Sequence, residues 1–163
     1  MKTKDITIIA ILSSILLIQK YALSFLPNIS LTIFLIVLYS KTLNTNKTVL
    51  IIFIYCILDN LIMGSFSIIY TPFMFIGWIL IPILLNSLFK NINKPFGLSL
   101  LGILFSFIYS LVNIIPNILF MNIKFLPYFL SDIPFELSLA ASSFFAILLL
   151  YKPCFKAIEK LIR

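Results

Sequence analysis

Residues Phe96–Phe120 read FGLSLLGILFSFIYSLVNIIPNILF and contain no charged side chain. A helix that crosses the hydrocarbon core of a bilayer needs about 20 predominantly apolar residues, and this stretch is longer than that. A transmembrane β-barrel would instead show strands of about ten residues with alternating polarity. The stretch therefore predicts a membrane-spanning helix.

The rest of the chain has the same character. Hydrophobic residues make up 62% of the 163 residues and charged residues only 10%, whereas soluble domains have about 25% charged residues. We expect an all-α integral membrane protein with six transmembrane helices in one bundle, a single domain over residues 1–163. No A-x-A-like site follows the first apolar run, so we expect a permanent helix there rather than a signal peptide. The expected spans are Ile6–Phe25, Ser30–Tyr39, Thr48–Gly64, Tyr70–Phe89, Phe96–Phe120 and Asp132–Tyr151.

The basic residues predict the orientation of these spans. With six crossings, ten of the twelve Lys and Arg residues fall on one side, and the loop from Met121 to Ser131 on the other side has only Lys124. The positive-inside rule then places both termini in the cytoplasm. This topology and contact with anionic lipid account for the net charge of +7, so no nucleic-acid partner is expected.

The residue types exclude most catalytic chemistry. The chain has no His and no Walker A sequence, and its two cysteines, Cys56 and Cys154, lie too far apart in the expected topology to form a metal pair. A Ser-His-Asp set is therefore also excluded. We expect neither an enzyme nor a bound metal or cofactor, and function must depend on polar residues inside the spans.

Lys20 and Asp59 are charged residues within the expected first and third spans, at matched depths from the outer ends. Charges inside a membrane are costly and usually pair or serve a function. Two interpretations are open for these residues. They form one ion pair that neutralises both charges, or one or both face a ligand.

A polar stripe runs along the span 96–120. Ser106, Ser110, Asn113 and Asn117 follow one another at spacings of four, three and four, which places them on one helical face. Hydrogen bonds between helices and the lining of a pocket explain this stripe equally well.

Two carboxylates, Asp132 and Glu136, open the last span one turn apart, and Ser143 follows on the same face. Asp132 is explained as an N-cap or as part of a pocket rim. Glu136 lies deeper and does not fit a capping box at this spacing, so we expect it in a pocket wall. A carboxylate pair suits a ligand with hydrogen-bond donors or positive charge.

Trp78 lies in the middle of its span, where it either packs in the core or against lipid, or stacks on a flat ligand. Ala10 and Ser14 are small residues four apart, which allow another helix to approach closely.

Three segments resemble one known family. YALSFLPNISLTIFLIVLYS (Tyr21–Ser40), FIGWILIPILL (Phe75–Leu85) and DIPFELSLAASSFFAILLLYKP (Asp132–Pro153) are similar to helices of the substrate-binding S-components of energy-coupling factor (ECF) transporters. The resemblance covers essentially the whole chain. Three positions depart from it: Ser14 stands where the family usually has Ala, and Leu139 and Ser143 stand where related sequences carry His and Asn.

The resemblance implies a six-helix bundle with an outward pocket that captures a vitamin or related micronutrient. It also implies a bacterial plasma membrane location, a membrane scaffold subunit that docks on Ala10 and Ser14, and two ATPase subunits. A multi-span structural protein of the bacterial cell envelope is the alternative, and it predicts no tight small ligand. The expected substrate-binding residues are Glu136, Asp132, Asn113, Asn117, Trp78, Lys20, Asp59 and Ser143.

Overall fold

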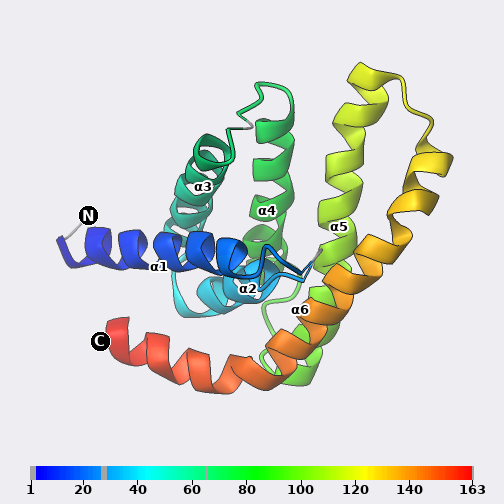
Figure 1. The fold of residues 1–163 in the computed structure, drawn as a ribbon. Helices are drawn as coiled ribbons and strands as arrows, with labels where there is room; N and C mark the ends of the chain where they lie inside the picture. Colours follow the sequence, from blue (N-terminus) through cyan, green and yellow to red (C-terminus); the bar gives the residue numbers. More distant parts are fainter. Residues whose placement is uncertain (1–2, 27–28, 65, 163) are drawn as a thin grey trace.

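The computed structural model describes residues 3–26, 29–64 and 66–162, and within these ranges it contains six α-helices and no strand (Figure 1). The all-α class predicted from the apolar runs is therefore confirmed. The helices are α1 (Thr3–Ala22), α2 (Thr32–Thr42), α3 (Thr45–Ile62), α4 (Tyr70–Asn86), α5 (Pro95–Met121) and α6 (Phe125–Ile162).

The helices differ in length. By length and composition, α1, α3, α5 and α6 are long and apolar enough to cross a membrane. Two further apolar helices, α2 and α4, are shorter, with 11 and 17 residues. These apolar helices indicate a membrane protein, while six crossings and the sides of the termini stay predictions.

The start of α6 differs from the prediction. The helix begins at Phe125, so much of the segment expected to be the loop Met121–Ser131 is helical. The backbone of Asn122 adopts a left-handed conformation (φ 53°), which ends α5 and lets the chain reverse within a few residues. Asp132 consequently lies about two turns inside α6, and its interpretation as an N-cap is wrong.

The short helix α2 forms the centre of the bundle. Every residue from Thr32 to Ser40 is buried, and α2 contacts each of the other five helices. A helix that is apolar on all sides is one that is buried on all sides. The side chains of α2 therefore pack mainly against the other helices.

Helices α5 and α6 form the most extensive helix pair. A Cβ atom at Gly102 would lie 2.7 Å from Cδ1 of Ile147, so glycine is what allows α6 to approach here. Beyond this contact, α6 turns away from α5 and runs toward the side where α1 begins (Figure 1).

Three lysines make polar contacts between segments that are distant in the sequence. The ammonium group of Lys4 donates to the carbonyl of Ile162 (2.8 Å), and Lys47 pairs with Asp5 (2.6 Å). Lys41 donates to the carbonyls of Phe89 (3.3 Å) and Lys90 (3.2 Å). The start of α1, the end of α6 and the loops that follow α2 and α4 are therefore joined by short polar contacts.

Candidate functional site

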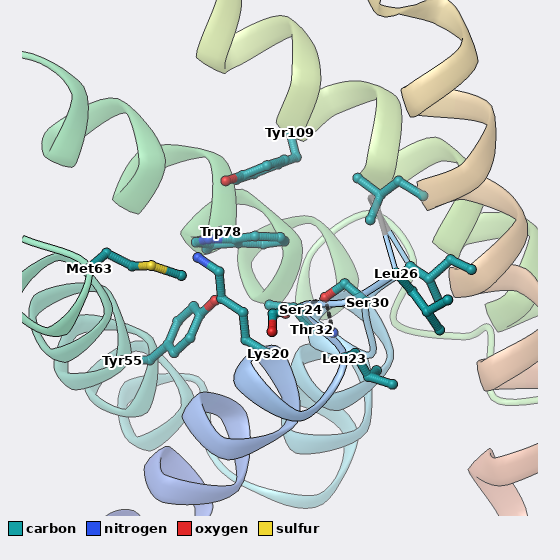
Figure 2. Close-up of a pocket in the computed structure, with 12 residues that line it drawn as sticks. Lys20, Leu23, Ser24, Leu26, Ser30, Thr32, Tyr55, Met63, Trp78 and Tyr109 are labelled. Carbon is teal, nitrogen blue, oxygen red and sulfur yellow. Dashed lines mark hydrogen bonds between the residues drawn. The ribbon is translucent and has the colours of Figure 1, made fainter. Parts of the chain in front are cut away.

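All six helices contribute to one cavity, with a volume of about 370 Å³ (Figure 2). We call it the six-helix cavity. One residue from each helix lines it, in chain order Lys20, Thr32, Tyr55, Trp78, Tyr109 and Leu139. The segment between α1 and α2 and the end of α3 complete the lining with Leu23, Ser24, Leu26, Ile29, Ser30 and Met63.

Aromatic rings form one wall of the six-helix cavity. Trp78 and Tyr109 stack with ring centroids 3.8 Å apart and an interplanar angle of 21°. A Cβ atom at Gly77 would lie 2.8 Å from Cδ2 of Tyr109, so glycine beside Trp78 makes room for this stack. Trp78 is buried, and its indole nitrogen Nε1 has no hydrogen-bond partner in the described structure. The wall thus offers flat apolar area, while the indole nitrogen itself is buried.

Lys20 and Asp59 form an ion pair with a distance of 2.6 Å between Nζ and Oδ2. The Asp59 side chain is 5% exposed and that of Lys20 is 35% exposed. Asp59 lies behind the cavity wall, whereas Lys20 lines the cavity itself. Of the two interpretations, the ion pair is present, and Lys20 additionally faces the space that a ligand would occupy.

A hydrogen-bond network holds the end of α1 against the start of α2. Gln19 Nε2 donates to Thr32 Oγ1 (2.7 Å), and the backbone N–H of Leu31 donates to Gln19 Oε1 (3.0 Å). The hydroxyl groups of Ser30 and Thr32 lie 2.8 Å apart, also hydrogen-bonded. This network fixes two of the polar groups that line the six-helix cavity.

A second, smaller cavity of about 170 Å³ lies between α5 and α6, and we call it the acidic cavity. Asp132 and Glu136 line it from α6, and Ser110 Oγ donates to Asp132 Oδ2 (3.1 Å) from α5. Glu136 is 5% exposed, and its Oε1 atom has no hydrogen-bond partner among the described residues. The other lining residues are Tyr109, Asn113, Ile114, Tyr128, Phe135 and Leu139.

The predicted binding residues therefore divide between two cavities. Lys20 and Trp78 belong to the six-helix cavity, and Asn113, Asp132 and Glu136 belong to the acidic cavity. Tyr109 and Leu139 line both, so they stand between the two spaces.

Asn117 and Ser143 line neither cavity. The hydroxyl of Tyr70 donates to Asn117 Oδ1 (2.8 Å), and Asn117 Nδ2 donates to the hydroxyl of Tyr128 (3.2 Å). Asn117 thus joins α4, α5 and α6, as the interhelical interpretation of the polar stripe predicts. Ser143 is fully buried against α5 near Gly102 and donates to the carbonyl of Leu139 (2.8 Å).

Ala10 and Ser14 lie on an exposed face of α1. Together with Leu50, Ile54 and Leu58 of α3, they line an apolar groove of about 300 Å³. The Ser14 hydroxyl donates to the carbonyl of Ala10 (2.8 Å), so its polarity is satisfied within α1. Small side chains here leave a shallow, mostly apolar surface open beside α3.

Tyr55 is a cavity residue that the sequence analysis missed, although a signal was present. It precedes Asp59 by four residues and so shares its helical face. Leu139 was noted only as a departure from a resemblance, because an apolar residue in an apolar run gives no signal of its own.

Comparison with protein-family models, with curated proteins and with solved structures found no match for this chain. Among the described residues, no group of three or more His, Cys, Asp or Glu side chains lies close enough to hold a metal ion. The functional assignment therefore rests on the two cavities and on the groups that line them.

Proposed function

We propose that this protein is the membrane-embedded substrate-capture subunit of an ECF-type importer, which binds a vitamin or related micronutrient at the outer face of the bacterial plasma membrane. The observation that carries this proposal is the six-helix cavity, to which every helix of the bundle contributes a side chain. A chain of 163 residues that directs all its helices to one space is organised around what occupies it.

The size and lining of the six-helix cavity support a small organic ligand. Its volume of about 370 Å³ is within the range of small-molecule pockets, roughly 300–1,000 Å³. Such pockets combine apolar walls with a few placed polar groups. Here the rings of Tyr55, Trp78 and Tyr109 suit a flat ring system, and Lys20 suits its acceptor atoms.

The proposed topology has six crossings with both termini in the cytoplasm. The contacts of Lys4, Lys41 and Lys47 support it, because they bring one set of expected cytoplasmic segments together. The central position of α2 supports a crossing that need not span the full hydrocarbon thickness, since its neighbours are protein.

In this proposal the protein works with a transmembrane scaffold subunit and two ATPase subunits. The groove at Ala10 and Ser14 is the proposed docking surface for the scaffold, because small residues allow close approach of a partner helix. The protein itself has no catalytic step to perform, and its task is to bind the ligand and release it.

Mass spectrometry of small molecules released from the detergent-purified protein tests the proposal. We expect a vitamin-like compound at about one molecule per protein in the unmodified chain and in Phe145→Ala, which removes an exposed ring from α6. Trp78→Ala should lose it, because the stacking wall is gone. An empty protein without a thermal shift across a vitamin panel would instead favour a structural protein of the cell envelope.

Docking has its own test. We expect Ala10→Leu to abolish co-purification with a co-expressed ECF scaffold subunit from the same genome, because the added side chain fills the groove. The control Ala141→Leu makes the same change at another exposed position, on α6, and should leave the complex intact. Equal recovery of the complex in both variants would remove the groove from the proposal.

A further inference from the structure

Glu136 presents a physical problem that the six-helix cavity does not solve. It is 5% exposed, and its Oε1 atom accepts no hydrogen bond in the described structure. Burying a carboxylate is costly unless a cation or several hydrogen bonds compensate for the loss of water. Something outside the chain is therefore needed to satisfy this oxygen in the ionised state.

The surroundings of Glu136 are polar and lack a cation. The hydroxyl groups of Ser106 and Ser110 lie beside it on α5, and Asp132 stands one turn before it on α6. No Lys or Arg is among the residues that line the acidic cavity. Lys20, the basic residue of the neighbouring cavity, is already paired with Asp59.

We propose that the acidic cavity binds a primary ammonium group, with the carboxylates of Glu136 and Asp132 as its acceptors. An ammonium group has three N–H donors, which suits two carboxylates and a nearby hydroxyl or amide. A divalent metal ion fits less well, because Ca²⁺ takes six to eight oxygen ligands. The cavity also contains Tyr128 and Asn113, which supply further polar groups.

Two kinds of ligand could carry this ammonium group. It belongs to a small free amine, or to a larger aromatic amine whose ring lies in the six-helix cavity. Tyr109 and Leu139 line both cavities, so a ligand that passes between these two side chains reaches both spaces. The ring would then meet Trp78, while the amine meets Glu136.

This inference stands apart from the proposed transport function. A neutral vitamin bound in the six-helix cavity leaves the acidic cavity unchanged, and an amine site would remain if the protein were a structural component of the envelope. Failure of one proposal therefore does not decide the other.

Thermal unfolding of the full chain in detergent tests the site with three named probes at constant ionic strength: 2-phenylethylammonium chloride, methylammonium chloride and the neutral 2-phenylethanol, each against sodium chloride. We expect 2-phenylethylammonium, well above its dissociation constant, to raise the midpoint by about 3 °C. The rise should persist in Glu159→Gln, which removes the same charge near the other end of α6, and should vanish in Glu136→Gln. Asp132→Asn should reduce it and serves as the second variant if Glu136→Gln does not fold.

The outcomes separate the sources. A rise with methylammonium as well indicates a site for small free amines, and a rise with the aromatic amine alone indicates a ligand that occupies both cavities. An equal rise with 2-phenylethanol would overturn the proposal, because the ring alone would then account for binding. A rise that persists in Glu136→Gln and Asp132→Asn, or no rise with either amine, would overturn it too.

Discussion

Asp59 of α3 and Glu136 of α6 are both buried carboxylates, 3% and 5% exposed, but their surroundings differ. Asp59 has the ammonium group of Lys20 at 2.6 Å, supplied by α1. Glu136 has no ion pair within the described residues, and instead lines an open space of about 170 Å³. Both groups carry the same cost of leaving water.

The difference shows two ways in which one bundle accommodates a buried acid. In the α1–α3 region the chain provides the opposite charge, so the charges are balanced before any ligand arrives. In the α5–α6 region the chain provides polar side chains and a cavity, with no Lys or Arg among the described residues that line it. Each carboxylate has one buried oxygen without a hydrogen-bond partner among the described residues, Oδ1 of Asp59 and Oε1 of Glu136, so the two regions differ in the presence of a paired cation.

The largest expected effect comes from removing the cation beside Asp59, which leaves this carboxylate without an ion pair, as Glu136 is. Lys20→Met removes the cation and leaves the buried Asp59 carboxylate unpaired. Breaking one partner of a buried pair costs about 3 kcal/mol, so the free energy of unfolding should fall by about that amount. Denaturation in detergent measures it. The double variant Lys20→Met/Asp59→Leu should recover most of the loss, and a double variant as unstable as the single one would refute the charge argument.

Next in size is the wall between the two cavities. Gly77→Ala places a methyl group 2.8 Å from Cδ2 of Tyr109 and should displace that ring. Overpacking of this kind costs about 2 kcal/mol. We expect ligand binding to weaken together with stability, as measured by thermal unfolding with and without the bound compound.

Gly102→Ala is the matched control for that variant. Its added methyl group would meet the end of the Ile147 side chain at 2.7 Å, in a part of the α5–α6 contact that lines neither cavity. Because the end of the Ile147 side chain can shift, Gly102→Ala should change stability less than Gly77→Ala and leave ligand affinity unchanged. Equal loss of affinity in both variants would mean that Tyr109 has no special position.

A smaller effect of opposite sign is expected for Glu136. In buffer without amines, Glu136→Gln removes a buried carboxylate that has no ion pair among the described residues, and should raise the free energy of unfolding by about 1 kcal/mol. Asp59→Asn should lower it, because it leaves Lys20 without its counter-charge. Comparison of the two chemical denaturation midpoints checks this, and two changes of the same sign would erase the contrast between the regions.

The smallest effect is expected at the junction of α4, α5 and α6. Asn117→Ala removes the hydrogen bonds to Tyr70 and Tyr128, and side-chain hydrogen bonds between membrane helices average about 0.6 kcal/mol. Stability should fall by roughly this amount, with ligand binding unchanged because Asn117 lines neither cavity. A binding defect larger than the stability loss would place Asn117 in the site.

The sequence predicted the helices best where a long apolar run had clear ends, and it predicted the ion pair from two charges at the same depth. Apolar runs located α3, α4 and α5 to within a few residues, and matched depth brought Lys20 and Asp59 together. The predicted start of the last span, Asp132, was wrong, because the helix already begins at Phe125. Proline is tolerated in the first turn of a helix, where its missing N–H needs no partner, and Pro127 lies in that turn.

The division of the site into two cavities was beyond the sequence. Helical spacing placed Asn113 and Asn117 on one face, but their partners depend on how α4 and α6 lie against α5. Asn117 is hydrogen-bonded to Tyr70 and Tyr128, whereas Asn113 lines the acidic cavity. Such a choice is made by packing between elements distant in the chain, which periodicity does not record.

The position of Tyr109 and Leu139 between the two cavities has a consequence for how such a protein changes its preferences over time. The separation between the two cavities depends on the size of two side chains, one of which is a leucine without a polar group. A smaller residue at position 139 would join the spaces into one elongated chamber, and a larger one would seal them apart. Under the proposed function, the range of ligands could therefore change by single conservative replacements while the helices, the ion pair and the fold stay as they are.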